Sequence, residues 1–190
     1  MKTNQLSIGS CCAALAVTVT AGILTSVSTF ANELELSINE ELIDLRFTSE
    51  YEKNFAGQLA FMHSDFEDLG SNQLSYKFFT QDKVGEFEVE LGAKGFWLDT
   101  EDDSGFGVAL GVGAAIELLP KLFAGASVYY SPDIITGGDF DNSFEVDARL
   151  AYQLLENGSL FVGYRRLEAD TGRIDIDVYD DAYFGVKFQF

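Results

Sequence analysis

AYFGVKFQF, residues 182–190, carries an apolar or small side chain at every second position up to the last residue. Side chains alternate between the two faces of a β-strand, so this pattern predicts a strand with one apolar face. On the edge of a soluble sheet, such a strand invites pairing with other chains. In a transmembrane barrel the apolar face meets lipid, and the edge closes against the first strand. The stretch therefore predicts a transmembrane β-barrel.

The same alternation recurs along residues 33–190, and no segment shows a convincing helical stripe. We predict an all-β, antiparallel, up-and-down transmembrane barrel of ten strands. If residues 33–50 form an appendage, the barrel has eight, and both numbers are even, as in bacterial single-chain barrels. The predicted strands are 33–38, 42–50, 55–64, 72–80, 85–98, 105–118, 121–131, 142–155, 158–168 and 182–190.

The predicted connections alternate in length. Short ones at 81–84, 119–120 and 156–158 separate long ones at 65–71, 99–104, 132–141 and 169–181. Outer-membrane barrels have short periplasmic turns and longer extracellular loops. We therefore expect both termini on the periplasmic side.

Residues 1–31 have the features of a secretory signal peptide. Lys2 precedes a mostly apolar run at 11–24, and Thr29-Phe30-Ala31 supplies small residues at the positions that a signal peptidase recognises. We predict cleavage after Ala31 and a barrel over 32–190, exported to the outer membrane. Lipidation at Cys11 is an alternative, although its cleavage box would precede the apolar run instead of following it.

The charge balance limits the partners. The chain has 12 basic and 31 acidic residues, a net charge of −19. Nucleic-acid binding needs basic surfaces, so we expect no nucleic-acid partner. Both cysteines, Cys11 and Cys12, lie in the predicted signal peptide. We expect a monomer without disulfides, whose partners are outer-membrane lipids and, during biogenesis, the barrel assembly machinery.

The C-terminus supports an assembly step. Tyr183, Gly185, Phe188 and Phe190 are spaced as polar residue, x, Gly, x, x, apolar residue, x, aromatic residue. This spacing resembles the C-terminal signal that marks bacterial barrels for membrane assembly. We expect these four residues to serve as that signal.

Several stretches together resemble a family, the YfaZ-type outer-membrane proteins, which are small predicted barrels. They are GAKGFWL (92–98), the glycine-rich 105–115, VYYSPD (128–133), GYRR (163–166) and YFGV (183–186). The resemblance covers about residues 92–190. It implies an outer-membrane location and brings no established activity.

The inward-facing positions of the predicted barrel collect charges of both signs. Near-balanced charges suit a lumen filled by ion pairs, because unpaired charges in a narrow interior are costly. Small residues at Gly105, Gly107, Gly111 and Gly113 suit a crowded lumen. The inward charges are Asp44, Arg46, Glu50, Lys77, Glu86, Glu88, Glu90, Lys94, Glu117, Glu145, Asp147, Arg149, Arg165 and Lys187.

A three-residue turn at 156–158 fixes which residues of the last hairpin face inward. It places Leu160, Val162 and Tyr164 toward lipid and Arg165 inside. It also predicts that Arg149 lies opposite Arg165, with Asp147 on the diagonal. Carboxylates must then intervene between the two arginines.

The predicted long loops and the strand ends beside them suggest two further hypotheses. His63 and Asp65 share one face, and with Asp102 and Asp103 across the rim they would activate water in a barrel hydrolase. The long loops are strongly acidic, which suggests loosely bound Ca²⁺ or Mg²⁺ and no other cofactor. Candidate ligands, none in an EF-hand pattern, are Asp99, Glu101, Asp102, Asp103, Asp175 and Asp177.

We expect a non-enzymatic protein with a structural or surface-interaction role and an ion-paired lumen. The main alternative is a narrow cation-preferring channel, for which a continuous water path is required. The rim hydrolase is a further alternative, and it requires a cleft that joins His63 to two carboxylates.

Overall fold

A computed structural model describes residues 32–190 except 102 and 173, so the predicted signal peptide lies outside the described residues. The strands are β1 (Asn32–Ile38), β2 (Leu42–Glu52), β3 (Phe55–Ser64), β4 (Ser71–Val84), β5 (Phe87–Thr100), β6 (Ser104–Leu119), β7 (Leu122–Ser131), β8 (Thr136–Gly138), β9 (Asn142–Leu155), β10 (Gly158–Asp170) and β11 (Asp175–Gln189). Two short 3-10 turns, η1 (Phe66–Asp68) and η2 (Asp133–Ile135), lie in loops.

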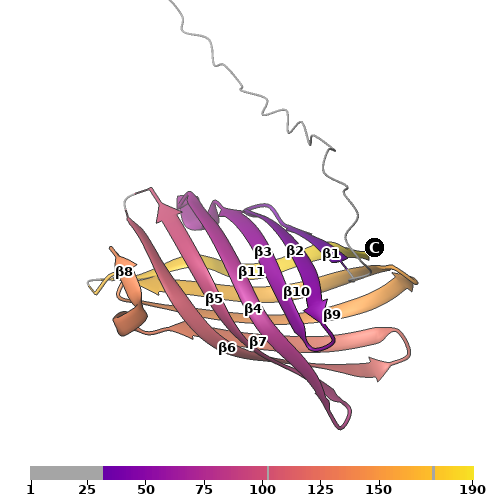
Figure 1. The fold of residues 1–190 in the computed structure, drawn as a ribbon. Helices are drawn as coiled ribbons and strands as arrows, with labels where there is room; N and C mark the ends of the chain where they lie inside the picture. The colour runs from indigo at the N-terminus through magenta and orange to yellow at the C-terminus, as the bar shows by residue number, and fades with distance from the viewer. Residues whose placement is uncertain (1–31, 102, 173) are drawn as a thin grey trace, which may run out of the picture.

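Ten of the described strands close an antiparallel barrel, which confirms the predicted fold (Figure 1). Each strand pairs with its neighbours in the chain, β7 pairs with β9, β1 pairs with β11, and the β5–β6 pairing completes the ring. β1 and β2 are full members, so the eight-stranded alternative is wrong. The short β8 pairs with Gly105–Gly107 of β6, beyond the part of β6 that pairs with β7.

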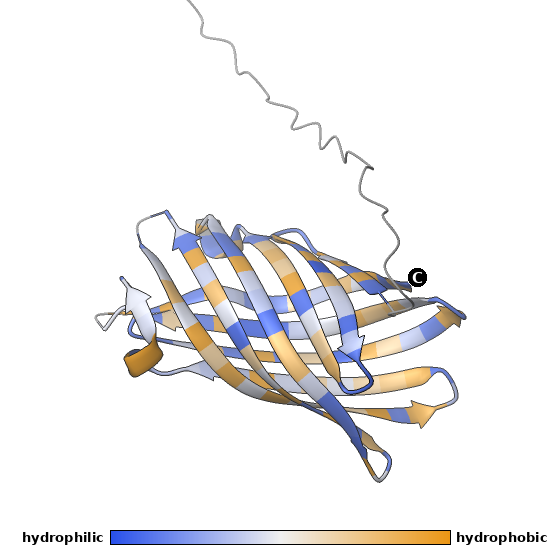
Figure 2. Ribbon diagram, viewed as in Figure 1, coloured by the Kyte–Doolittle hydropathy of each residue, from blue (hydrophilic) through white to orange (hydrophobic). Residues whose placement is uncertain are grey.

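Apolar and polar residues alternate along the strands (Figure 2). The outward positions carry exposed apolar side chains on every side of the barrel, including Leu45 on β2, Trp97 on β5 and Val162 on β10. Such a band is what a lipid-facing surface requires. Within the described residues, no helix is long and apolar enough to be a candidate membrane span.

The two ends of the barrel differ. Asn32, the first residue that the structure describes, lies at the same end as Phe190 and the two-residue turns at 53–54, 85–86, 120–121 and 156–157, and we call this the terminal end. The connections at 39–41, 65–70, 101–103, 132–141 and 171–174 lie at the other, the loop end. Asn32 and Phe190 exchange two backbone hydrogen bonds, of 3.1 and 2.9 Å, which fasten the β1–β11 seam.

Two predicted connections are strand in the structure. Residues 81–84 continue β4, and the turn is Gly85-Glu86, where Gly85 adopts a φ of +67° that glycine tolerates best. Residues 175–181 belong to β11, because Ile176 and Val178 extend the inward apolar alternation past a bulge opposite Leu167 and Glu168. Acidic residues on the outward side had obscured this strand.

The predicted facing of Arg149 and Arg165 is wrong. The turn has two residues, Glu156 and Asn157, and a bulge beside Gly158 shifts the register of β9. Arg165 therefore pairs directly with Asp147, and Arg149 pairs with Gly163. This register puts opposite charges side by side and leaves Leu160, Val162 and Tyr164 exposed on the outside.

Inward glycines make room for aromatic rings. A Cβ at Gly163 would lie 2.5 Å from Cζ of Tyr183, and a Cβ at Gly111 would overlap the ring of Tyr129. Gly185 gives the same space to Phe161. The barrel interior is thus packed by rings lying across glycine positions of the neighbouring strand.

Candidate functional site: the charged lumen

A cavity of about 500 Å³ occupies the interior toward the terminal end. Its lining reaches Asp44, Met62 and Gln73 in the direction of the loop end. All members of the predicted lumen charge cluster line it, namely Glu88, Glu90, Lys94, Glu145, Asp147, Arg149, Arg165 and Lys187.

The inward charges differ from the prediction at four positions. Glu33 and Glu35 also line the cavity, although the sequence analysis omitted them. The alternation of NELELSI over β1 contains this signal, because Leu34 and Leu36 are exposed on the outside. Glu86 and Glu117 are exposed at the terminal end, and neither belongs to the cavity lining.

Arg165 is the centre of the first ion-pair network. Its Nε lies 2.9 Å from Oδ2 of Asp147, and its Nη1 lies 2.7 Å from Oδ2 of Asp44 on β2, three strands away around the barrel. The same Asp44 oxygen accepts a 2.8 Å hydrogen bond from Nε of Arg46. Arg165 and Asp44 are each only 1% exposed. A charge buried this deeply requires its partners, because desolvation is otherwise uncompensated.

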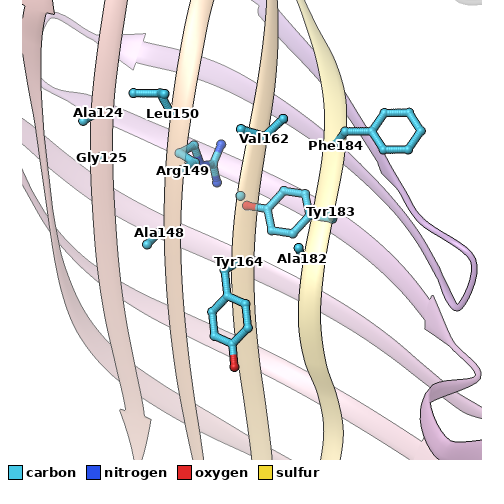
Figure 3. Close-up of a pocket in the computed structure, with 11 residues that line it drawn as sticks. Ala124, Gly125, Ala148, Arg149, Leu150, Val162, Tyr164, Ala182, Tyr183 and Phe184 are labelled. Atoms are coloured by element: carbon cyan, nitrogen blue, oxygen red, sulfur yellow. The ribbon is translucent and has the colours of Figure 1, made fainter.

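Asp147 extends this network to Tyr183 on β11 and, through Arg149, to Glu35 on β1. Its oxygens accept hydrogen bonds of 2.9 and 2.8 Å from the Tyr183 hydroxyl, and Nε of Arg149 lies 3.3 Å away. Nη1 of Arg149 also binds both carboxylate oxygens of Glu35, each at 3.1 Å. Figure 3 shows the Tyr183 ring extending from β11 across β10 toward Arg149.

The outer surface of this wall is shallowly hollowed. Figure 3 shows Ala148 and Ala182 on either side of Tyr164, next to the row of Leu150, Val162 and Phe184. These side chains belong to the apolar outside of the barrel, whereas Arg149 and Tyr183 belong to the lumen. The depression is therefore separate from the charged cavity.

A second network lies on β4, β5, β7 and β9. Nζ of Lys77 is 2.9 Å from Oε1 of Glu90, which also accepts a 2.5 Å hydrogen bond from the Tyr129 hydroxyl. Lys94 pairs with Glu145. Nζ of Lys77 and Nζ of Lys94 each lie 5.7 Å from the centre of the Tyr129 ring. Neighbouring cations are thus separated by carboxylates and an aromatic face.

Exposure falls steadily from the terminal end inward. The Lys187 and Glu33 side chains, paired at 3.0 Å, are 30% and 21% exposed. Arg46 is 12% exposed, and Arg165 and Asp44 are almost fully buried. The cavity is therefore open at the terminal end and narrows to a dry inner end.

Beyond Arg165 the buried interior has no charged side chain among the described residues, and it combines large apolar side chains with small polar ones such as Ser37, Ser64 and Ser71. Leu42, Leu98, Leu167 and Val178 are buried inside the barrel, and Leu98 and Val178 have no exposed surface. Phe140, from the loop between β8 and β9, is also buried in this cluster. We call these five residues the apolar plug. This plug was not predicted from the sequence, because the inward charges were expected to fill the whole lumen.

The segment 132–141 holds Phe140 in place. β8 pairs with β6, and Ser104 and Asp139 exchange hydrogen bonds of 2.9 and 3.0 Å. A Cβ at Gly105 would overlap the Phe140 ring. The segment thus completes the wall beside β6 and contributes a ring to the plug.

His63 lies on the outside of β3 near the loop end. Its Nδ1 is 3.0 Å from Oδ1 of Asn72, and its Nε2 is 3.5 Å from Oδ2 of Asp65. Asp102 lies outside the described residues, and the Asp103 carbonyl accepts a hydrogen bond from the Thr100 hydroxyl. Among the described residues of the hydrolase hypothesis, only Asp65 lies near His63.

The acidic candidates at the loop end are dispersed. Asp99 lies opposite Ser104 in the ladder, and Glu101 follows in the exposed β5–β6 connection. Asp175 lies opposite Asp170. Over the part of the chain that the structure describes, no three His, Cys, Asp or Glu side chains are grouped to hold a metal ion. Loosely bound Ca²⁺ or Mg²⁺ stays a prediction.

Arg166 offsets part of this acidity. It pairs with Glu168 on its own strand and lies 3.6 and 3.8 Å from Asp177 and Asp180 of β11. Arg173, a second basic residue near these loops, lies outside the described residues. Alternation along β10 places Arg166 and Glu168 on its outward face, so the sequence contained the information needed to predict their pairing.

The four residues of the predicted assembly signal lie on β11 and at the end of the chain. Tyr183 and Gly185 are buried inside, whereas Phe188 and Phe190 are exposed. Phe188 pairs with Leu34 of β1 across the seam. Their role in assembly stays a prediction.

Comparison with known proteins identifies a family and several barrels. A family model described as YfaZ precursor matches residues 12–190. The chain is similar in structure to the KdgM porin in complex with disordered oligogalacturonate, with 10% identity and a TM-score of 0.46 over 84% of this chain and 99% of that chain. It is also similar to the NanC porin, with 9% identity and a TM-score of 0.45 over 85% of this chain and 99% of that chain.

OmpT, an outer membrane protein of Vibrio cholerae, is also similar, with 10% identity and a TM-score of 0.41 over 90% of this chain and 100% of that chain. At these identities, the likeness concerns the fold alone. A search of curated proteins finds no match.

Proposed function

We propose that this chain, which belongs to the YfaZ precursor family, is a non-enzymatic integral protein of the bacterial outer membrane whose lumen does not conduct. Its role is structural or one of surface interaction. The terminal end faces the periplasm, because short turns lie on that side in outer-membrane barrels. The loop end then faces the cell exterior.

The apolar plug carries this proposal. An ion that crosses the barrel must pass the layer of Leu42, Leu98 and Val178, which are almost completely buried. Transfer of a bare ion past these buried apolar side chains is strongly unfavourable, because they offer it no polar partner in place of water. The charged cavity alone, open at one end, does not make a pore.

Single-channel recording of the refolded protein in a planar bilayer tests the proposal. We expect no conductance steps from wild-type protein, with insertion verified by heat-modifiable mobility of the same preparation. Stable cation-selective steps from inserted wild-type protein would overturn it. A triple variant, Leu98→Gly, Leu167→Gly and Phe140→Gly, is the matched control, because removing these side chains thins the plug and should raise the frequency of openings.

A narrow cation-preferring channel is the second candidate. One observation favours it, namely the cavity of about 500 Å³ that charged side chains line over part of the lumen. A channel requires the plug to move aside. Steps that appear in wild-type protein only above a threshold voltage would support this function over the first.

A further inference from the structure

We propose that the charged cavity binds a short peptide with a free C-terminal carboxylate, taken up from the terminal end. This inference goes beyond the proposed function, which assigns no ligand. The shape of the cavity is the first argument. It opens at the terminal end and stops at the apolar plug, so a ligand enters and leaves by one mouth. Its volume of about 500 Å³ falls within the range of small-molecule sites.

Arg46 supplies the carboxylate contact. Its Nε donates to Oδ2 of Asp44, an oxygen that also accepts from Arg165. Its two terminal nitrogens make no hydrogen bond to any residue that the structure describes, and the side chain lines the cavity with part of its surface exposed. A guanidinium with both terminal nitrogens free is suited to bind a carboxylate through two parallel hydrogen bonds.

The wall beside Arg46 leaves room for a ligand. Ala60 of β3 lies directly opposite Arg46 of β2. Ala56 of β3 lies opposite Glu50, nearer the mouth of the cavity. Between them Gln58 donates to the Thr48 hydroxyl. Small side chains on β3 therefore line the cavity between the mouth and Arg46, and the polar groups of Gln58 and Thr48 beside them can hydrogen-bond a peptide backbone.

The mouth supplies the opposite charge. Glu50 and Glu88 line the cavity, are exposed, and have no ion-pair partner among the described residues. Glu50 and Arg46 face inward on the same strand, four residues apart, which places their Cα atoms about 13 Å from each other. A purely anionic ligand is repelled at this mouth. A ligand with a carboxylate at one end and an ammonium about 13 Å away satisfies both ends.

An extended peptide of about four residues has this separation, since each residue spans at most about 3.5 Å. Its zwitterionic form is neutral, as is the inner end of the cavity, where Arg46, Arg149 and Arg165 meet Glu35, Asp44 and Asp147. The carboxylate lies at Arg46 and the ammonium at Glu50.

Isothermal titration calorimetry with tetra-alanine tests this assignment on the refolded barrel. We expect measurable binding of the free peptide and at least about tenfold weaker binding of its C-terminal amide, because the amide loses the charge-assisted contact. This comparison uses wild-type protein alone, so it does not depend on the folding of a variant. Equal affinity for the two peptides, or no binding of either, would overturn the proposal.

Variants locate the two charges. Arg46→Gln should weaken the free peptide about as much as amidation does, and it should leave the amide unaffected. Glu50→Gln should weaken the free peptide but not the N-acetylated one. Arg166→Gln, on the outer surface, is the matched control and should change nothing. An effect of Arg166→Gln equal to that of Arg46→Gln would place binding outside the cavity and overturn the proposal.

Discussion

The two halves of the lumen are filled by different kinds of side chain. Toward the terminal end, the interior is charged and its exposure falls gradually from Lys187 to Arg165. Toward the loop end, it is buried and uncharged among the described residues, with large apolar side chains such as Leu42 and Val178 beside small polar ones such as Ser64 and Ser71. Both halves sit behind the same lipid-facing surface. The outward side chains are therefore of one kind along most of each strand, whereas the kind of inward side chain changes along the barrel axis.

This difference shows where the molecule tolerates water. Ion pairs near the mouth remain partly solvated, so each is worth little. Those at the inner end adjoin the apolar plug, and they are held by shared partners, as Asp44 and Asp147 are held between arginines. The boundary lies at Arg165. Variants on either side of this boundary should therefore respond differently.

The largest effect is expected at the inner end of the charged half. Asp147→Ala removes the carboxylate that pairs with Arg149 and Arg165 and accepts from Tyr183. Leaving buried cations without a partner costs about 3 to 5 kcal/mol of unfolding free energy. Urea titration in detergent or lipid vesicles measures it.

Glu88→Ala is the control for this variant, because Glu88 is an exposed carboxylate of the same cavity. We expect a change below about 0.5 kcal/mol there, as for other surface substitutions. A similarly small loss for Asp147→Ala would mean that water replaces the lost carboxylate, and the boundary at Arg165 would not exist.

The apolar half should respond next most strongly. Leu98→Ala deletes a completely buried side chain of the plug, and large-to-small changes of this kind cost about 2 to 5 kcal/mol. Leu91→Ala, on the lipid face of the same strand, should cost less, because lipid fills the space that the side chain leaves. Equal losses in equilibrium unfolding would show that the plug is not tightly packed.

The fold followed from the sequence because lipid imposes one pattern on all strands. Alternation in 85–98 and 182–190 marks the outside clearly, and a closed barrel is the form that satisfies a strand backbone in a membrane. Boundaries were less certain. Residues 175–181 alternate too, but their outward positions are acidic, since this part of β11 extends toward the loop end beyond the apolar band.

The lumen was only partly predictable for a different reason. Which residues face inward follows from alternation, and this identified Asp147 and Arg165. Which inward residues meet depends on the register. The shorter turn at 156–157 and the bulge beside Gly158 each shift that register by one residue, and together they place Asp147 opposite Arg165. The plug also depends on Phe140, whose inward position comes from a loop without periodicity.

A smaller effect is expected where rings cross glycines. At Gly163 an added Cβ would lie 2.5 Å from Cζ and 2.6 Å from Oη of Tyr183, so the ring must move and its hydrogen bonds to Asp147 must lengthen. Overpacking of this kind costs about 1 to 3 kcal/mol, so Gly163→Ala should destabilise by that amount in urea titration.

Gly95→Ala is the matched control for Gly163→Ala. Its nearest contact for an added Cβ is 3.9 Å, an ordinary van der Waals distance. The change should be neutral or slightly stabilising, because alanine restricts the unfolded chain. If both glycine variants behaved alike, the rings would not be fixed in position, and the inner end of the charged half would be more mobile than its packing indicates.

The smallest effect is expected at the mouth. Glu33→Gln breaks the 3.0 Å pair with Lys187, whose partners are 21% and 30% exposed. A partly solvated pair contributes about 1 kcal/mol or less, and salt screens it. We therefore expect a small loss that shrinks further in 1 M sodium chloride, whereas the loss for Asp147→Ala should hardly change with salt. A loss at Glu33 as large as that at Asp147, with no salt dependence, would mean that the charged half is dry throughout. The gradient of exposure would then have no energetic consequence, and the contrast between the two ends of the cavity would fail.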